Sequence, residues 1–170
     1  MQKNLSRKAE LEPEHQFENL YSLLCNHVWL RAAHASVNTN QGRETAGIDG
    51  ESMMQFNGDI EGNLATLRDM LKAKVFEPMP VRRVYIPKAN GKKRPLGIPT
   101  IRDRIVQEAL RMILEPTWEA DFSNRSYGFR PNRSTYDAIS YLSNRLTGNG
   151  GGKFQWVLEG DITSYFDHTP

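Results

Sequence analysis

Apolar side chains recur every three or four residues in four parts of the chain, and this spacing predicts four helices. Residues 1–12 are polar and aperiodic, so we expect a frayed start. Pro116 has no backbone N–H to donate and should stop the third helix. The helices are expected at about residues 14–37, 59–71, 100–115 and 134–146.

The pattern changes to a β period over residues 81–98, on either side of an Asn-Gly pair. Such a pair between β-branched and aromatic runs predicts a hairpin. A two-residue loop would place Lys88 and Arg94 on opposite faces, whereas a three-residue loop would place them on one face. Residues 154–162 (FQWVLEGDI) predict a mostly buried strand. Helices, a hairpin and one further strand together indicate an α+β fold.

The size of the chain fits a single ordinary domain, because 170 residues with 38% hydrophobic side chains can bury one core. Its longest apolar stretch is far shorter than the ~20 residues that a membrane helix needs. The N-terminus has no apolar signal region, and Cys25 has no second cysteine with which to form a disulfide. These features predict a cytosolic protein without a membrane partner.

The net charge of +2 conceals a concentration of positive charge over residues 82–111, where nine basic residues face two acidic ones. A field of one sign this dense suggests a polyanionic partner, either nucleic acid or polyphosphate. On charge alone, a solvated basic face is an equally good interpretation. The basic residues are Arg82, Arg83, Lys88, Lys92, Lys93, Arg94, Arg102, Arg104 and Arg111.

Asp161 stands at the end of the predicted strand, which would fix its carboxylate and leave it open to a substrate or metal. A generic strand-end acid fits this position as well. Asp167 cannot easily share the same ion, because six extended residues span roughly 20 Å and a two-metal site needs ~4 Å. Lys88 and Arg94 could together clamp a triphosphate if the hairpin has the three-residue loop.

Four blocks of the sequence, in order, resemble the N-terminal part of group II intron-encoded reverse transcriptases, also called maturases. TAGIDG (residues 45–50) resembles the block ahead of the fingers, and residues 81–116 resemble the fingers hairpin and its following helix. SYGFRPNRS (126–134) is similar to the third block, and GDITSYFD (160–167) to the first palm motif. The implied domains are an N-terminal helical extension (1–37), helical fingers with the basic antiparallel hairpin (38–153) and the first strand of an incomplete right-hand palm (154–170).

This resemblance implies a role for each matching residue. Asp161 would be the catalytic acid and a ligand of two Mg²⁺ ions, and the carbonyl of Ile162 would bind one ion. The implied nucleotide-binding residues are Lys88, Arg94, Ser164, Tyr165 and Phe166, whose ring would select deoxynucleotides. The implied RNA-binding residues are Asn40, Gly47, Asp49, Arg82, Arg83, Lys92, Lys93, Thr100, Arg102, Tyr127, Arg130 and Arg133.

The function implied by the resemblance is RNA-directed DNA synthesis, together with assistance in splicing a group II intron. Its partners would be the intron RNA, an RNA template with a DNA primer, and dNTPs, and the chain could form a homodimer. The host compartment would be a bacterial or archaeal cytosol, or an organelle of bacterial ancestry. The second palm motif and the thumb are missing here, so we expect these 170 residues alone to be inactive. The alternative is a non-catalytic RNA-binding splicing cofactor or a truncated relic.

Overall fold

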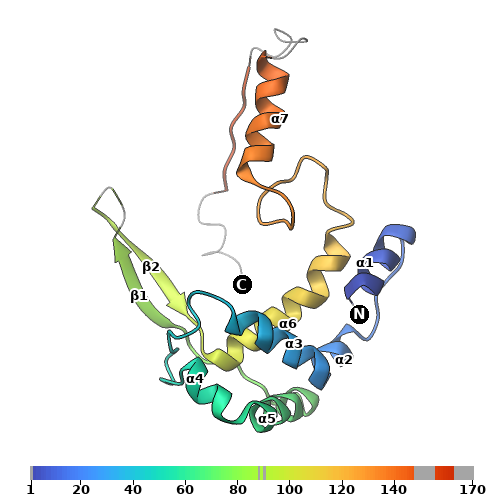
Figure 1. Cartoon of the computed structure of the whole chain (residues 1–170). Helices are drawn as coiled ribbons and strands as arrows, with labels where there is room; N and C mark the ends of the chain where they lie inside the picture. Colours follow the sequence, from blue (N-terminus) through green and yellow to red (C-terminus); the bar gives the residue numbers. More distant parts are fainter. Residues whose placement is uncertain (1, 88, 90, 148–155, 163–170) are drawn as a thin grey trace. The chain divides into compact units, whose positions relative to one another are not determined.

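The computed structural model describes residues 2–87, 89, 91–147 and 156–162, and it divides the chain into two compact units, 1–121 and 122–170 (Figure 1). The mixture of helices and a small antiparallel sheet agrees with the predicted α+β class. The first unit contains α1 (Gln2–Leu11), α2 (Leu20–Leu24), α3 (His27–Asn38), α4 (Met53–Phe56), a 3-10 turn (Asn57–Asp59), α5 (Ile60–Lys72), β1 (Arg82–Pro87), β2 (Lys93–Ile98) and α6 (Ile101–Trp118). The second contains α7 (Thr135–Thr147).

The core of the first unit lies where α3, α5 and α6 pack together (Figure 1). α3 and α6 are also joined by a buried hydrogen bond, in which the indole Nε1 of Trp29 donates to the carbonyl of Ala109 at 3.0 Å. The fully buried apolar side chains are Leu30, Ala33, Phe56, Leu64, Leu67, Ile101, Ile105 and Ala109. This packing fixes the start of α6, and therefore the base of the hairpin that leads into it. No described helix is both long and apolar enough to cross a membrane.

The N-terminal region differs from the prediction of one helix over residues 14–37 behind a frayed start. Residues 2–11 form α1, which packs on α6 and buries Ala9, and the predicted long helix is divided into α2 and α3. An asparagine stands immediately before each of the two helices. Asn19 has a left-handed backbone (φ 58°) before α2, and the side chain of Asn26 caps α3 by accepting from the amides of Val28 and Trp29 at 2.9 and 3.3 Å.

Pro116 does not stop α6, which continues to Trp118. A proline in a helix frees the carbonyl four residues before it, here that of Met112. The side chain of Gln2 supplies the missing donor, since its Nε2 lies 3.1 Å from the Met112 oxygen. α1 therefore compensates for a proline that would otherwise leave a carbonyl without a donor.

The helices predicted over residues 59–71 and 134–146 are confirmed as α5 and α7, and each begins next to a capping side chain. Asp59 accepts from the amide of Gly62 at 2.9 Å, and the Ser134 hydroxyl lies 2.6 Å from an Asp137 carboxylate oxygen. This hydrogen bond is the main reason that the pKa of Asp137 is lowered. The two apolar faces differ, because α5 buries its leucines whereas α7 leaves Ile139, Leu142 and Leu146 at 59%, 56% and 41% exposure.

The prediction of a buried strand over 154–162 is wrong for the residues that the structure describes. Residues 156–162 form no strand, and Trp156, Val157 and Leu158 are 92%, 79% and 99% exposed. A strand needs a hydrogen-bonded neighbour to hide its backbone and one face. Within the described ranges, the sheet consists of β1 and β2, which pair with each other, so the apolar segment has nothing to pair with.

Candidate nucleic-acid interface

The hairpin register is the one expected of the longer loop. Ile86 lies opposite Arg94 and Pro87 opposite Lys93, as a three-residue loop requires. Because alternate residues of a strand share a face, Arg94 lies on the same face as Ile86 and Arg82. This is the register in which Lys88 and Arg94 could act together, although Lys88 itself lies outside the described residues.

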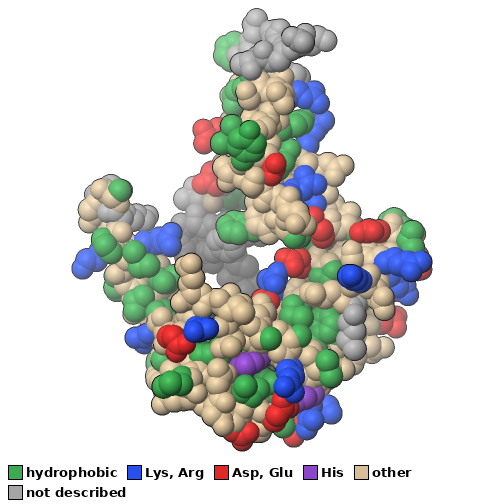
Figure 2. Space-filling view, in the orientation of Figure 1, with side chains coloured by type: hydrophobic (Ala, Val, Ile, Leu, Met, Phe, Trp, Pro, Cys, Tyr) green, Lys and Arg blue, Asp and Glu red, His purple; other side chains and the backbone are tan. Residues whose placement is uncertain are grey.

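The hairpin carries four exposed cations that have no acidic partner within the described residues. They are distributed over both faces of the ribbon, because Arg82 and Arg94 lie on one face and Arg83 and Lys93 on the other. Figure 2 shows Lys and Arg side chains along the hairpin at the left of the view. Lys92 is also exposed, but it has an interaction within the chain. Four unneutralised cations on a narrow ribbon form a site of strong attraction for phosphates.

The loop over residues 38–50 lies against the junction between the hairpin and α6. Gly47 is buried there, and a Cβ at this position would stand 2.6 Å from the Cα of Thr100. Asn40 and Asp49, two other predicted RNA-binding residues, are exposed on the same loop. Gly47 therefore brings the loop backbone into direct contact with the start of α6, and it offers no side chain to a ligand.

Replacing Gly47 with alanine is expected to displace this loop or to destabilise the first unit by about 1–3 kcal/mol, as in other overpacked sites. The contact is with backbone atoms, which cannot rotate aside as a side chain can. Urea denaturation with Gly42→Ala as control measures the effect, because a Cβ at Gly42 has nothing within 4 Å. Equal stabilities for the two variants would contradict the prediction.

Thr100 and Arg102, both predicted to bind RNA, hold the start of α6. Thr100 is 1% exposed, and its hydroxyl donates to the carboxylate of Asp103 at 2.7 Å while accepting from that residue's amide. Arg102 is partly exposed and lies 3.6 Å from a carboxylate oxygen of Glu51. In this structure the Thr100 hydroxyl therefore caps the helix, with both its donor and an acceptor site used by Asp103.

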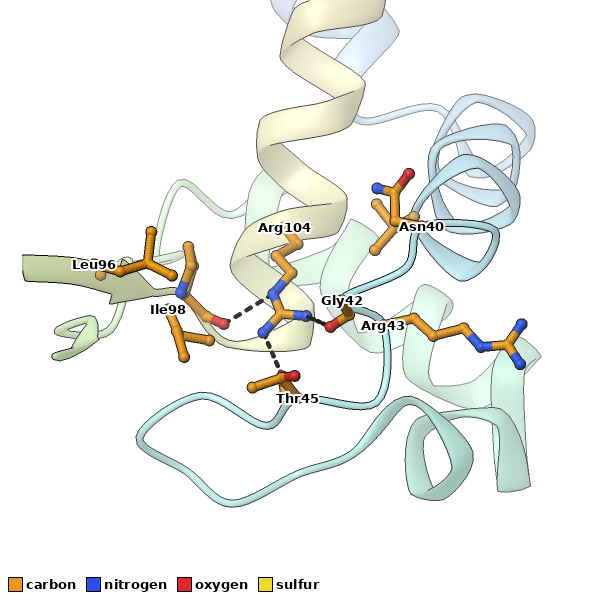
Figure 3. Close-up of a pocket in the computed structure, with 10 residues that line it drawn as sticks. Asn40, Gly42, Arg43, Thr45, Leu96, Ile98 and Arg104 are labelled. Atoms are coloured by element: carbon orange, nitrogen blue, oxygen red, sulfur yellow. Dashed lines mark hydrogen bonds between the residues drawn. The ribbon is translucent and has the colours of Figure 1, made fainter. Parts of the chain in front are cut away.

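Arg104 was not among the predicted site residues, yet it joins three chain segments (Figure 3). Its Nε donates to the Pro99 carbonyl at 3.0 Å, Nη1 to the Gly42 carbonyl at 3.1 Å, and Nη2 to the Thr45 carbonyl. Burial lowers the pKa of the guanidinium, the nearby Asp49 carboxylate raises it, and Arg82 lowers it. A cation in the first turn of a helix opposes the helix dipole, and this was the one sequence signal for a special role.

A cavity of about 290 Å³ lies beside Arg104, between the 38–50 loop and β2 (Figure 3). Its β2 wall is largely apolar and is formed by Leu96, Gly97 and Ile98. The opposite wall comes from the loop, including Asn40 and Arg43. The loop, the hairpin base and α6 therefore border an open hollow at the foot of the basic ribbon.

In the second unit, the predicted RNA-binding residues mainly support the segment before α7. Arg130 is 8% exposed and donates to the carbonyls of Ser123 and Ser126 at 2.6 and 2.9 Å. Arg133 donates to the Asn124 carbonyl at 2.7 Å, and its guanidinium lies 5.6 Å from the centre of the Tyr127 ring. Both arginines are therefore engaged with their own segment, and Arg133 and Tyr127 stay partly accessible.

Asp161 and Ile162 are exposed, and Ser164, Tyr165 and Phe166 lie outside the described residues. Across the described ranges, no three His, Cys, Asp or Glu side chains gather closely enough to hold a metal ion. A two-ion site needs several carboxylates, and Asp161 alone does not fit that requirement. We therefore assign no catalytic step to the described residues.

Comparison with known proteins places these features in a family. A family model described as reverse transcriptase (RNA-dependent DNA polymerase) matches residues 86–170. The chain is 44% identical over 167 residues to the protein YkfC of Escherichia coli, covering 98% of this chain and 44% of that protein. It is 36% identical over 165 residues to the group II intron-encoded protein LtrA of Lactococcus lactis, covering 96% of this chain and 26% of LtrA. A 70-residue stretch is 40% identical to the nuclear intron maturase 1, mitochondrial, of Arabidopsis thaliana, covering 41% of this chain and 9% of the maturase.

Proposed function

Because this chain belongs to the reverse transcriptase family and is similar to the N-terminal portion of group II intron-encoded proteins, we propose that it binds RNA as the fingers of such an enzyme. The chain spans less than half the length of YkfC and about a quarter of LtrA. The proposed activity of the complete natural protein is RNA-directed DNA synthesis, together with assistance in splicing a group II intron. Its proposed location is a bacterial or archaeal cytosol or an organelle, and its relatives include a bacterial protein and a plant maturase whose name describes it as mitochondrial.

The single observation that carries this proposal is the hairpin with four cations that lack acidic partners in the described structure. Arginine and lysine side chains that neutralise phosphates release condensed counterions from the nucleic acid, which favours binding at moderate salt. Because the hairpin carries cations on both faces, it can contact RNA phosphates on either face. The 38–50 loop, with Asn40 and Asp49 exposed, borders the same surface.

The nucleotide and metal roles form the finer part of the proposal. Arg94 would bind the triphosphate together with Lys88, which the observed register permits. Asp161 would supply one carboxylate of the metal site, and Ser164, Tyr165 and Phe166 would line the nucleotide. A second candidate function is RNA binding without catalysis, as in a splicing cofactor, because the hairpin needs no contribution from Asp161 to hold RNA.

The proposal predicts a steep salt dependence of RNA binding that falls when a hairpin cation is removed. Each phosphate contact adds about 0.7 to the slope of log K against log salt for a single strand. Arg83→Gln and Lys93→Gln should therefore each lower that slope by about 0.7, and the double change by about 1.4. Fluorescence anisotropy with a labelled single-stranded RNA at four or five salt concentrations measures it.

The matched control is Arg7→Gln, which removes an exposed cation of α1 far along the chain from the hairpin. It should leave the slope unchanged. If the control lowers the slope as much as the hairpin changes do, binding is a diffuse effect of net charge. If none of the variants changes it, the hairpin is not the RNA-binding surface.

A further inference from the structure

The three hydrogen bonds of Arg104 join the start of α6 to one turn of the 38–50 loop. Gly42 and Thr45 are the two ends of that turn, because the amide of Thr45 also donates to the Gly42 carbonyl at 3.1 Å. Arg104 thus holds both ends of a turn with Nη1 and Nη2, while Nε holds the carbonyl of Pro99 at the end of the hairpin. A planar guanidinium has the fixed fork that such an arrangement requires, and a lysine ammonium does not.

A second contact, at Gly47, also joins the loop to the start of α6. Gly47 packs directly on the backbone of Pro99 and Thr100, at the same junction where Arg104 donates to the Pro99 carbonyl. The contacts of Arg43 stay within the loop, since its Nη1 donates to the Asn38 carbonyl at 3.1 Å and its Nε to Glu44 at 2.9 Å. Arg43 therefore shapes the loop, whereas Arg104 attaches it to the hairpin base.

We propose that Arg104 is a positioning residue that fixes the 42–45 turn against the base of the hairpin and so sets the shape of the RNA-binding surface before RNA arrives. The part of this inference that concerns RNA rests on the proposed function. The guanidinium donates to three protein carbonyls, so its contribution differs from that of Arg94, whose side chain makes no ion pair among the described residues. Arg104 acts through the loop and not as a direct phosphate contact.

Amide hydrogen exchange on Arg104→Lys tests the attachment, because this change keeps the positive charge and removes the fork. We expect the hydrogen-bonded amides of Arg43 and Thr45 to exchange at least about tenfold faster, since charged hydrogen bonds to both ends of the turn are lost. Amides of α3 and α5 should exchange at their original rates. Arg111→Lys, the same substitution on the same helix at a guanidinium whose two glutamate partners also lie on α6, should leave the amides of Arg43 and Thr45 within about twofold of their original rates. Unchanged exchange in Arg104→Lys would overturn the proposal.

Nuclear magnetic resonance of the unmodified protein gives a measurement that does not depend on a variant folding. The Nε–H of Arg104 donates to the Pro99 carbonyl and should exchange with water much more slowly than the Nε–H groups of the hairpin arginines Arg82 and Arg83. Equal exchange for all three would show that Arg104 is not attached, and would overturn the proposal even if Arg104→Lys failed to fold.

RNA binding by the same variant separates this inference from the proposed function. Arg104→Lys should weaken binding of a single-stranded RNA about fivefold with the slope against salt unchanged, because the surface loses its shape but no phosphate contact. A slope lower by about 0.7 in Arg104→Gln, which removes the charge, would mean that Arg104 touches phosphate directly, and would overturn the positioning role. If the unmodified protein bound no RNA, the proposed function would fail while the exchange experiments would still decide whether Arg104 holds the loop.

Discussion

Replacing Asp161 with alanine in the complete natural protein is expected to reduce RNA-templated DNA synthesis to background while changing RNA affinity by less than about twofold. A phosphoryl-transfer site concentrates carboxylates around divalent ions, and Asp161 is the acid that the family resemblance places there. The RNA surface should be unaffected, because the hairpin cations belong to the other unit. Primer extension on an RNA template and anisotropy with the same RNA measure the two effects.

Glu159→Ala is the matched control, since Glu159 is an exposed acid two residues away on the same segment. It should retain synthesis. A preparation of residues 1–170 alone is expected to give no synthesis with or without Asp161, because a single carboxylate cannot hold two ions. Synthesis retained in Asp161→Ala would remove the catalytic role from this residue, whereas no synthesis by the unmodified protein would favour the splicing-cofactor alternative.

Replacing Trp29 with alanine is expected to lower the free energy of unfolding of the first unit by about 3–5 kcal/mol, the usual cost of truncating a buried aromatic side chain. The ring is 4% exposed at the contact of α3 with α6, and its Nε1 donates to the Ala109 carbonyl. Loss of the ring leaves a cavity, and loss of the donor leaves a buried carbonyl unpaired. Urea denaturation followed by far-ultraviolet circular dichroism measures the change.

Two further variants divide this effect into its parts. Trp29→Phe keeps most of the ring and should cost about 1–2 kcal/mol through the lost hydrogen bond and a small cavity. Trp118→Ala removes the same side chain at a position that is 56% exposed, and should cost less than about 1.5 kcal/mol. If Trp29→Ala and Trp118→Ala had equal effects, the core would not lie at the α3 and α6 contact.

The elements predicted well from the sequence are those fixed by local chemistry. Asp59, Thr100 and Ser134 each satisfy a helix amide a few residues away, so the signal and its effect lie within one turn of chain. The hairpin was equally local, because its strands and its Asn-Gly loop are contiguous. The basic character of the candidate site was visible for the same reason, since all its hairpin cations fall in a single window.

The errors arose where a distant residue decides the outcome. Apolar spacing alone favoured one helix over 14–37, and the asparagines at its breaks carried weaker signals than the periodicity. Pro116 continues a helix because Gln2, more than a hundred residues earlier, supplies a donor. The strand predicted at 154–162 had the correct composition, but strand formation depends on a neighbour that a single segment cannot specify.

The positive charge of the candidate site was predictable from the sequence, but the backbone contacts that shape the site were not. Arg104 binds three backbone carbonyls, which every residue possesses, so nothing in the sequence of the loop identifies them as its partners. Gly47 was singled out as part of a motif, whereas the structure shows that its missing side chain makes room for the Thr100 backbone. In both cases the contact is with backbone atoms, which are the same in every residue, so the partner cannot be recognised from the sequence.

The three tryptophans provide the protein with built-in optical reporters. Indole emission shifts to shorter wavelength when water is excluded, so buried Trp29 and solvent-exposed Trp156 should contribute to opposite ends of the spectrum. Trp156 lies on the exposed apolar segment 156–158, and a partner that covered this segment would shield the indole ring of Trp156 from water. In a Trp118→Phe background, which removes the other exposed indole, a blue shift of the long-wavelength emission with the Trp29 contribution constant would identify molecules that cover this segment without any label.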